Sequence, residues 1–184
     1  NRPYVVEIDF ANFFNTIPHK KLMSVVKRKI RDVKLLGLIR KFLKSTTILT
    51  NGQGAKTTCR TPQGGLMSPI LANIYLNEVV DQWFTENHSS YNNIIVRYAD
   101  DAVFFFRKEE DARMFLADFK SRVASFGLEL NEEKSRSLCF KKQEHNHFNF
   151  LGFTFYWGKF RRRRNLKVKT EKKKLLKSMN EFYQ

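Results

Sequence analysis

The chain has 184 residues, enough for one domain and part of a second. Its 34 lysine and arginine residues outnumber 18 acidic ones, and the net charge of +16 indicates a polyanionic partner, nucleic acid above all. Two cysteines are too few for a disulfide framework, and no apolar run approaches the roughly 20 residues of a membrane span. The chain starts without Met and without a signal peptide, so we interpret it as an internal fragment with no membrane partner.

The first predicted strand lies within Tyr4–Phe10 and ends in Asp9. Two amphipathic helices are predicted over residues 19 to 45. Their apolar faces comprise Leu22, Val25, Val26 and Ile30 in the first helix and Leu35, Leu38, Ile39, Phe42 and Leu43 in the second. A Thr-Asn-Gly-Gln-Gly turn then predicts a hairpin within residues 47 to 58.

A glycine-rich loop, Thr61–Ile70, opens the next helix. Gly64 and Gly65 lack a Cβ, so the backbone there can approach a ligand closely. The helix has Pro69 in its first turn, and its apolar positions are Ile70, Leu71, Ile74, Val79, Val80 and Trp83. Free N–H groups at such a loop suit a phosphate or a nucleotide sugar, although the same residues equally suit a turn that starts a core helix.

Two adjacent carboxylates, Asp100 and Asp101, lie at the tip of a predicted strand–turn–strand unit over Ile94–Phe106. Burying a carboxylate without a partner is costly, so this tip is solvated or holds a cation. Most Asp-Asp pairs are solvated turn residues, and Asp9 could simply end a strand. Together, the three carboxylates suit Mg²⁺, which prefers oxygen ligands, and two such ions about 3.5–4 Å apart serve an in-line displacement at phosphorus.

The chain continues with an amphipathic helix ended by Gly127, with apolar positions Ala112, Phe115, Leu116, Phe119, Val123 and Phe126. The polar loop Leu128–Ser135 leaves Lys134 solvated by default. The alternating run Phe148–Tyr156 predicts one strand with a bend at Gly152. This order of elements predicts an α+β fold with helices packed on one face of a sheet.

The stretch from Lys159 to Lys177 is strongly basic and contains one acid, Glu171. Because it follows an aromatic strand, the run favours contact with a phosphate backbone, and such contact weakens steeply with salt. A helix is predicted over Lys172–Phe182, and we place the domain boundary at this end of the chain.

Five ordered motifs resemble the palm of reverse transcriptases, and in detail that of bacterial group II intron-encoded reverse transcriptases and maturases. They are Asp9–His19, Thr61–Pro69 continuing into Ala72–Asn77, Tyr98–Asp101, Leu130–Ser135 and Phe150–Phe153. The Pro-Gln-Gly-Gly-x-x-Ser-Pro form favours this branch over retrons, and its Ser-Pro ending argues against diversity-generating retroelements. One departure is Arg60, where many group II enzymes have Gly.

The resemblance implies a right-hand polymerase palm, an antiparallel sheet with helices on one face, over residues 1–158. Some fingers-like elements would lie within 19–60, and residues 159–184 would be a basic connection into the start of a thumb. Fingers strands would precede Asn1, so this fragment is expected to be weak or inactive in isolation. The implied activity is RNA-directed DNA polymerisation in the bacterial cytoplasm, with two Mg²⁺ ions for which Mn²⁺ can substitute. Implied partners are an RNA template, a DNA or RNA primer, dNTPs and intron RNA.

The resemblance also implies catalytic roles for single residues. Asp9, Asp100 and Asp101 would hold the metal ions, with the Phe10 carbonyl as a backbone ligand. Lys134 would protonate the leaving pyrophosphate.

Binding roles follow from the same motifs. The nucleotide site would comprise Phe10, Ala11, Asn12, Phe13, Phe14, Gln63, Gly64 and Gly65. Either Phe13 or Phe14 would exclude a ribose 2′-hydroxyl, and we favour Phe14, although both rings could be core. Leu151 and Gly152 would grip the primer end. The nucleic-acid backbone would contact Arg161, Arg162, Arg163, Arg164, Lys167 and Lys169.

Two alternatives stay open at this point. The fold could serve as an RNA-binding maturase module that assists intron splicing, with an incidental polymerase site. It could also belong to a domesticated reverse transcriptase in phage defence or CRISPR spacer acquisition.

Overall fold

The computed structural model describes residues 2–44, 47–48, 54–55, 67–89, 92–160, 163–172, 175–176 and 180. Its internal contacts divide the chain into two units. The first unit comprises Asn1–Asp9, Ser89–Ala117 and Glu132–Gln184, and the second comprises Phe10–His88 and Asp118–Asn131. Within the described ranges no helix is both long and apolar enough to cross a membrane. The predicted α+β class is confirmed, since both units combine helices with antiparallel strands.

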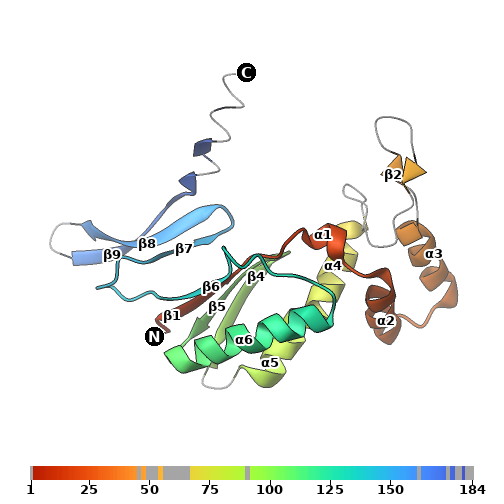
Figure 1. The fold of residues 1–184 in the computed structure, drawn as a ribbon, viewed down its shortest axis with the longest axis horizontal. Helices are drawn as coiled ribbons and strands as arrows, with labels where there is room; N and C mark the ends of the chain where they lie inside the picture. Colours follow the sequence, from red (N-terminus) through yellow and green to blue (C-terminus); the bar gives the residue numbers. More distant parts are fainter. Residues whose placement is uncertain are drawn as a thin grey trace. The chain divides into compact units, whose positions relative to one another are not determined.

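A four-stranded antiparallel sheet forms the centre of the first unit (Figure 1). Its strands are β1 (Tyr4–Ile8), β4 (Ile94–Tyr98), β5 (Asp101–Phe106) and β6 (Arg136–Cys139), in the order β4-β5-β1-β6. The sequence did not predict β6, because four residues that include Arg and Ser carry too little apolar alternation. Strand β1 is central, and its residues Val5 and Val6 are fully buried.

One face of this sheet is covered by the first part of α6 (Glu109–Ser125). The Phe115 ring centroid lies 4.4 Å from that of Phe104 and 5.1 Å from that of Phe106. All three rings are fully buried. The apolar face predicted for this helix is therefore confirmed at Phe115, and Gly127 follows the helix with a φ of 74°, as a left-handed C-terminal residue should.

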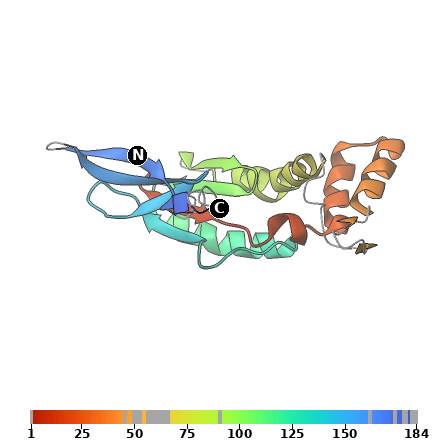
Figure 2. The same cartoon turned by 90° about the horizontal axis from the view of Figure 1, so that it is seen from above.

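A three-stranded antiparallel sheet covers the opposite face, drawn in blue in Figures 1 and 2. Its strands are β7 (His147–Phe150), β8 (Phe153–Phe160) and β9 (Arg163–Thr170). The predicted single bent strand over Phe148–Tyr156 is wrong. Leu151 and Gly152 both have positive φ, 52° and 77°, and form a two-residue turn that folds the run into a hairpin.

The two sheets of the first unit pack through an apolar cluster. Val5, Val103 and Phe148 form its buried centre, one residue each from β1, β5 and β7. The Phe148 and Phe155 rings stack at 4.9 Å with an interplanar angle of 7°. Because strands alternate sides, polar residues two positions further along β1 reach the end of this cluster on the same face.

The second unit begins with α1 (Phe13–Thr16) and two predicted helices, α2 (His19–Lys29) and α3 (Val33–Lys44). The face predicted for α3 is partly wrong: Leu36, Ile39 and Leu43 are buried, whereas Leu35 and Leu38 are 40% and 61% exposed. The predicted hairpin is confirmed where it is described. Strands β2 (Thr47–Ile48) and β3 (Gly54–Ala55) pair antiparallel.

The predicted long helix contains a π-helical turn. It comprises α4 (Ser68–Leu76), η1 (Asn77–Gln82) and α5 (Trp83–Asn87). Arg122 of α6 donates to the carbonyl oxygens of Glu78 and Val79 within this turn, at 3.0 and 3.3 Å. A guanidinium therefore contacts carbonyls in the segment where the helix widens. Ile70, placed with the apolar positions by the sequence, is 60% exposed.

Candidate active site

Asp9 and Asp101 occupy the same end of two neighbouring strands. β1 and β5 run antiparallel with Ile8 opposite Ala102. The next position beyond this pair is therefore Asp9 on one strand and Asp101 on the other. Residues that lie far apart in the sequence thus bring two carboxylates to one edge of the sheet.

Asp100 lies in the turn that joins β4 to β5. Tyr98 pairs with Asp101, so the turn itself consists of Ala99 and Asp100, and Ala99 has a φ of 52°. The sequence placed both aspartates at the tip, but Asp101 is already the first residue of β5. Of the two adjacent carboxylates, that of Asp100 therefore lies in the turn and that of Asp101 in a strand.

Asp9 and Asp101 line a cavity of about 470 Å³ in the first unit. Five acidic and two basic side chains contribute to its walls. The lining residues are Glu7, Ile8, Asp9, Asp101, Glu133, Lys134, Arg136, Asn149, Phe150, Gly152 and Glu171. Three residues with predicted catalytic roles, Asp9, Asp101 and Lys134, thus meet in one cavity with Gly152.

The side chain of Asp9 is paired with Lys134. The Lys134 Nζ donates to Asp9 Oδ2 at 3.0 Å, with both side chains about half exposed. The backbone of Asp9 is held by Ser135, whose Oγ accepts from the Asp9 N–H at 3.1 Å and donates to the Asp9 carbonyl at 3.2 Å. Ser135 is 6% exposed, and no role was predicted for it, since a serine in a polar loop carries no pattern of its own.

Asp101 is joined to the turn predicted to grip the primer. The Leu151 N–H donates to Asp101 Oδ2 at 2.7 Å. Leu151 has a positive φ and is the first residue of the tight turn between β7 and β8. The structure therefore places Leu151 against one of the carboxylates.

The predicted nucleotide residues Phe10 to Phe14 belong to the second unit. Phe10 forms an isolated antiparallel bridge with Leu130, and the Ala11 N–H donates to the Glu129 carbonyl at 2.9 Å. Asn12 precedes α1 with a φ of 48°.

The two candidate rings for sugar selection differ in burial. Phe13 is 3% exposed, and its ring centroid lies 5.4 Å from that of Phe10, which is core packing. Phe14 is half-buried. The role of Phe14 stays a prediction.

Several residues with predicted binding roles lie outside the described residues. They are Gln63, Gly64, Gly65, Arg161 and Arg162.

Comparison with known proteins identifies the family of this chain. The family model described as "Reverse transcriptase (RNA-dependent DNA polymerase)" matches residues 1–155. The chain belongs to the reverse transcriptase family. The description of this family names an RNA-dependent DNA polymerase.

The relatives of this reverse transcriptase chain include intron proteins. The group II intron-encoded protein LtrA of Lactococcus lactis subsp. cremoris is 47% identical over 76 residues, which cover 41% of this chain and 12% of LtrA. Protein YkfC of Escherichia coli is 36% identical over 109 residues, covering 54% of this chain and 28% of YkfC. The chain therefore spans only a small part of the length of these relatives.

Solved structures show the same fold. Apo telomerase from Candida tropicalis, truncated from its C-terminal domain, superimposes with a TM-score of 0.67 at 15% identity over 91% of this chain and 35% of the telomerase. Telomerase from Candida albicans in complex with a fragment of telomeric RNA gives a TM-score of 0.67 at 12% identity over 98% of this chain and 34% of that chain. The likeness confirms the polymerase-like palm fold.

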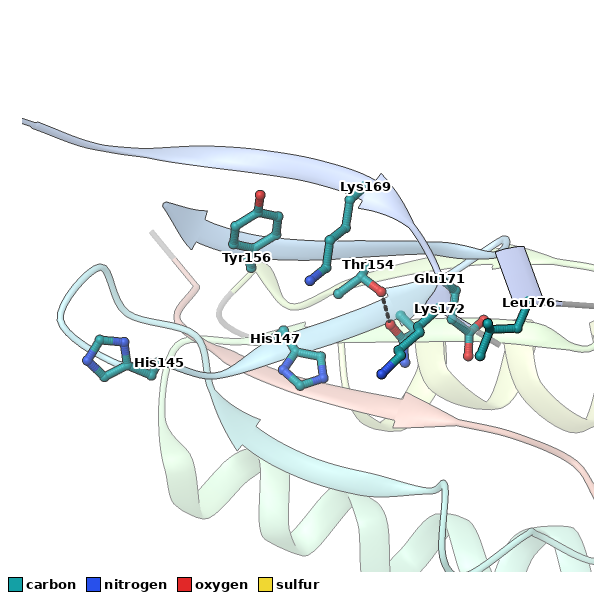
Figure 3. Close-up of a pocket in the computed structure, with 9 residues that line it drawn as sticks. His145, His147, Thr154, Tyr156, Lys169, Glu171, Lys172 and Leu176 are labelled. Carbon is teal, nitrogen blue, oxygen red and sulfur yellow. Dashed lines mark hydrogen bonds between the residues drawn. The ribbon is translucent and has the colours of Figure 1, made fainter. Parts of the chain in front are cut away.

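This reverse transcriptase has a second cavity of about 530 Å³ on the outer face of the three-stranded sheet (Figure 3). It is lined by His145, His147, Asn149, Thr154, Tyr156, Lys169, Glu171, Lys172 and Leu176. The Lys169 Nζ lies 5.0 Å from the centre of the Tyr156 ring. Asn149 and Glu171 line both cavities, so this outer face adjoins the carboxylates.

The basic side chains of β9 project from both faces of the strand. Lys167 and Lys169 alternate with apolar residues and share one face of the strand, and Lys167 lies across Gly158 with its Nζ donating to the Lys159 carbonyl at 3.0 Å. Arg164 instead donates to the Lys142 carbonyl at 2.6 Å. The sequence did not predict β9, because a run of cations resembles a solvated connection until its partner strand β8 is known.

Proposed function

We propose that this chain carries the catalytic palm of an RNA-directed DNA polymerase of a group II intron-like retroelement. The observation that carries the proposal is that Asp9 and Asp101 share one cavity with Lys134 in a chain of the reverse transcriptase family. The substrates would be an RNA template, a primer 3′-hydroxyl and dNTPs. We propose a bacterial source and the cytoplasm as the location, since two of the relatives are from Lactococcus lactis and Escherichia coli, although intron proteins of yeasts match as well.

The carboxylates fit a divalent cation. In the described part of the chain, no three carboxylate, imidazole or thiolate groups gather closely enough to hold an ion unaided. Mg²⁺ does not need such a cage, because it commonly binds one or two carboxylates and completes its shell with water and substrate phosphates. Asp9 and Asp101 would supply those two ligands, and we propose Asp100 and the Phe10 carbonyl as further ones.

We propose two Mg²⁺ ions, replaceable by Mn²⁺. When bound, such ions supply Lewis-acid activation of the primer hydroxyl and charge neutralisation at the leaving pyrophosphate. The protein would contribute orientation. Ser135 fixes the Asp9 backbone, and the Leu151 N–H fixes one Asp101 oxygen, so both carboxylates keep their place before any substrate arrives.

We propose that Lys134 acts as the proton donor to pyrophosphate. Its ammonium lies in the cavity and donates to Asp9 Oδ2. Because the pair is about half exposed, it is weak and can exchange partners when a phosphate enters. A general acid must lie within hydrogen-bond distance of its acceptor. Lys134 lines the cavity in which we place the pyrophosphate, so it would need only a small movement to reach it.

We propose that nucleic acid follows the outer face of β8 and β9 toward the carboxylates. Lys169, Tyr156 and Lys172 combine cations with an aromatic ring there (Figure 3). Cations neutralise phosphates and aromatic rings stack on bases, which is how proteins hold strands without reading their sequence. Arg163 and Lys167, on the same face of β9 as Lys169, would extend this contact, whereas Arg164 projects from the other face and donates to the Lys142 carbonyl.

The decisive test is primer extension on an RNA template with Mg²⁺ or Mn²⁺ and dNTPs. The full-length protein is compared with an Asp100→Ala, Asp101→Ala double variant, and RNA binding is measured in both. Extension by the parent that is lost in the variant, with binding retained, establishes the proposal. An inactive parent that binds structured intron RNA as well as the variant does would overturn it in favour of a splicing role.

A further inference from the structure

Glu7 is a buried acid that the motifs of the family resemblance leave without a role. It is the penultimate residue of β1 and is 7% exposed. Asp9 follows two positions later, so both side chains project from the same face of the sheet and both line the carboxylate cavity. A carboxylate at such a place is costly to bury unless it is fully bonded.

The bonds of Glu7 join three strands. Arg136 of β6 donates from Nε to Glu7 Oε2 at 2.6 Å. The backbone N–H of Asn149 in β7 donates to Glu7 Oε1. Arg136 also donates to the carbonyl of His147 at 3.2 Å, so the pair holds β7 at two points of its backbone.

These bonds lead directly to the turn at the carboxylates. Asn149 is followed two residues later by Leu151, whose N–H donates to Asp101. The Asn149 side chain accepts from Thr154 Oγ1 at 2.7 Å, the dashed line in Figure 3, and so ties β7 to β8 across the turn. One edge of the β7–β8 hairpin is therefore fixed by Glu7 from β1 and by Asp101 from β5.

Stability is a poor explanation for this pair. The Glu7 side chain is 10% exposed and the Arg136 side chain is 46% exposed. The cost of desolvating the buried carboxylate offsets much of the attraction within such a pair, and replacing both partners by apolar residues is often neutral or stabilising. The neighbouring contact between the sheets, around Val5, Val103 and Phe148, is apolar and therefore non-directional. The two directional hydrogen bonds that the Glu7 carboxylate accepts can set the position of β7 along β1. An apolar contact cannot set this position, because it allows the strands to slide.

We propose that Glu7 and Arg136 are positioning residues that hold the Leu151–Gly152 turn against Asp101 and thereby place the primer end. This rests on the proposed polymerase function. Both side chains line the cavity, but their polar groups bond to each other and to the β7 backbone, so we propose that they act through the turn and not on substrate or metal. Its loss would misplace the primer 3′-hydroxyl while the dNTP site stays intact, and a misplacement of about 1 Å costs on the order of 100-fold in rate.

The test uses the full-length protein with a Glu7→Met, Arg136→Met double variant. Its matched control is Glu109→Gln, Arg113→Gln, which removes an exposed pair joined at 2.6 Å on α6. We expect the Met pair to keep its unfolding midpoint and its KM for dNTP, while kcat falls about 10- to 100-fold. The control should change none of the three.

A second variant and a second readout keep the two proposals separate. Glu7→Gln retains an acceptor for the Asn149 N–H and is expected to keep more activity than Glu7→Met. Hydrogen exchange at the Leu151 amide should quicken in the Met pair but not in the control, and this readout needs no polymerase activity. Unchanged exchange together with unchanged kcat, or a loss of kcat that only follows the loss of folded protein, would overturn the positioning role.

Discussion

Lys134 and Asp9 form a hydrogen-bonded ion pair inside the carboxylate cavity, with 3.0 Å between Nζ and Oδ2. A divalent ion held by Asp9, as we propose, would use the same oxygen, so the lysine and the ion would compete for it. With both side chains about half exposed, the pair contributes about 0.2–1 kcal/mol.

Replacing Lys134 by Met should therefore change binding and catalysis in opposite directions. Mn²⁺ binding should tighten by about 1.5- to 5-fold because the competing cation is gone. Primer extension should slow by about 10²- to 10⁴-fold if the lysine is the proton donor. Titration calorimetry and steady-state extension measure the two effects, and Lys120→Met removes the same charge from α6 as a control. Weaker Mn²⁺ binding in Lys134→Met would contradict the competition.

Asp101 should show two separable roles. Asp101→Asn removes the charge but keeps an oxygen that can accept from the Leu151 N–H, whereas Asp101→Ala removes both. Extension should be lost in both variants. Primer affinity should stay close to the parent value in the Asn variant and weaken by about 2- to 10-fold in the Ala variant, since one hydrogen bond is lost. Equal primer affinities by fluorescence anisotropy would refute the link between the turn and this carboxylate.

Lys167 and Lys169 should contribute to the salt dependence of nucleic-acid binding. In the Lys167→Gln, Lys169→Gln variant, the slope of log K against log salt should fall by about 2, one for each lost phosphate contact. Lys27→Gln, Lys29→Gln removes two exposed cations from α2 and should leave the slope as it is. Filter binding between 50 and 300 mM salt, about the useful range for such contacts, gives both slopes. A similar decrease of the slope in both variants would mean that Lys167 and Lys169 contribute only to the general electrostatic attraction between the basic chain and nucleic acid.

Gly127 and Gly37 should respond oppositely to Ala. Gly127 has a φ of 74°, and a Cβ there would lie 2.7 Å from Pro18 Cγ, so Gly127→Ala should lower the free energy of unfolding by at least about 1–2 kcal/mol. Gly37 lies inside α3 with nothing within 4 Å of its Cβ position, so Gly37→Ala should raise it by about 0.5–1 kcal/mol. Urea denaturation measures both changes. A stabilised Gly127→Ala variant would disprove the strained conformation.

Arg122 should be needed for the π-helical turn. Burial lowers the pKa of its guanidinium, which donates to the carbonyls of Glu78 and Val79 and lies 4.3 Å from the Phe126 ring centre. Arg122→Met should cost about 1.5–3 kcal/mol of unfolding free energy. Arg122→Lys should recover only part of this, because an ammonium cannot reproduce the forked geometry. Full recovery by Lys in urea denaturation would show that charge matters and geometry does not.

Some parts of this molecule follow from the sequence because they depend on local patterns. The compact β-prone run Tyr4–Phe10 predicts a strand that leads to Asp9, and β1 ends one residue before it, at Ile8. The apolar spacing around Phe115 predicts the buried face of α6. Gly127 marks a helix end because few other residues accept its φ. The ordered motifs, whose spacing is a property of the chain, were enough to indicate the family that the comparison confirms.

Other parts were decided by tertiary contacts. Strands β6 and β9 carry too many polar residues to be recognised until β1 and β8 supply their hydrogen bonds. The run around Gly152 looks like one strand, but the positive φ of Leu151 and Gly152 reverses it, and only then does the Leu151 N–H meet Asp101. Glu7 gives no signal in the sequence, because a glutamate in a strand is ordinarily exposed. Its burial and its bonds to Arg136 and Asn149 arise only when three strands distant in the sequence are brought together.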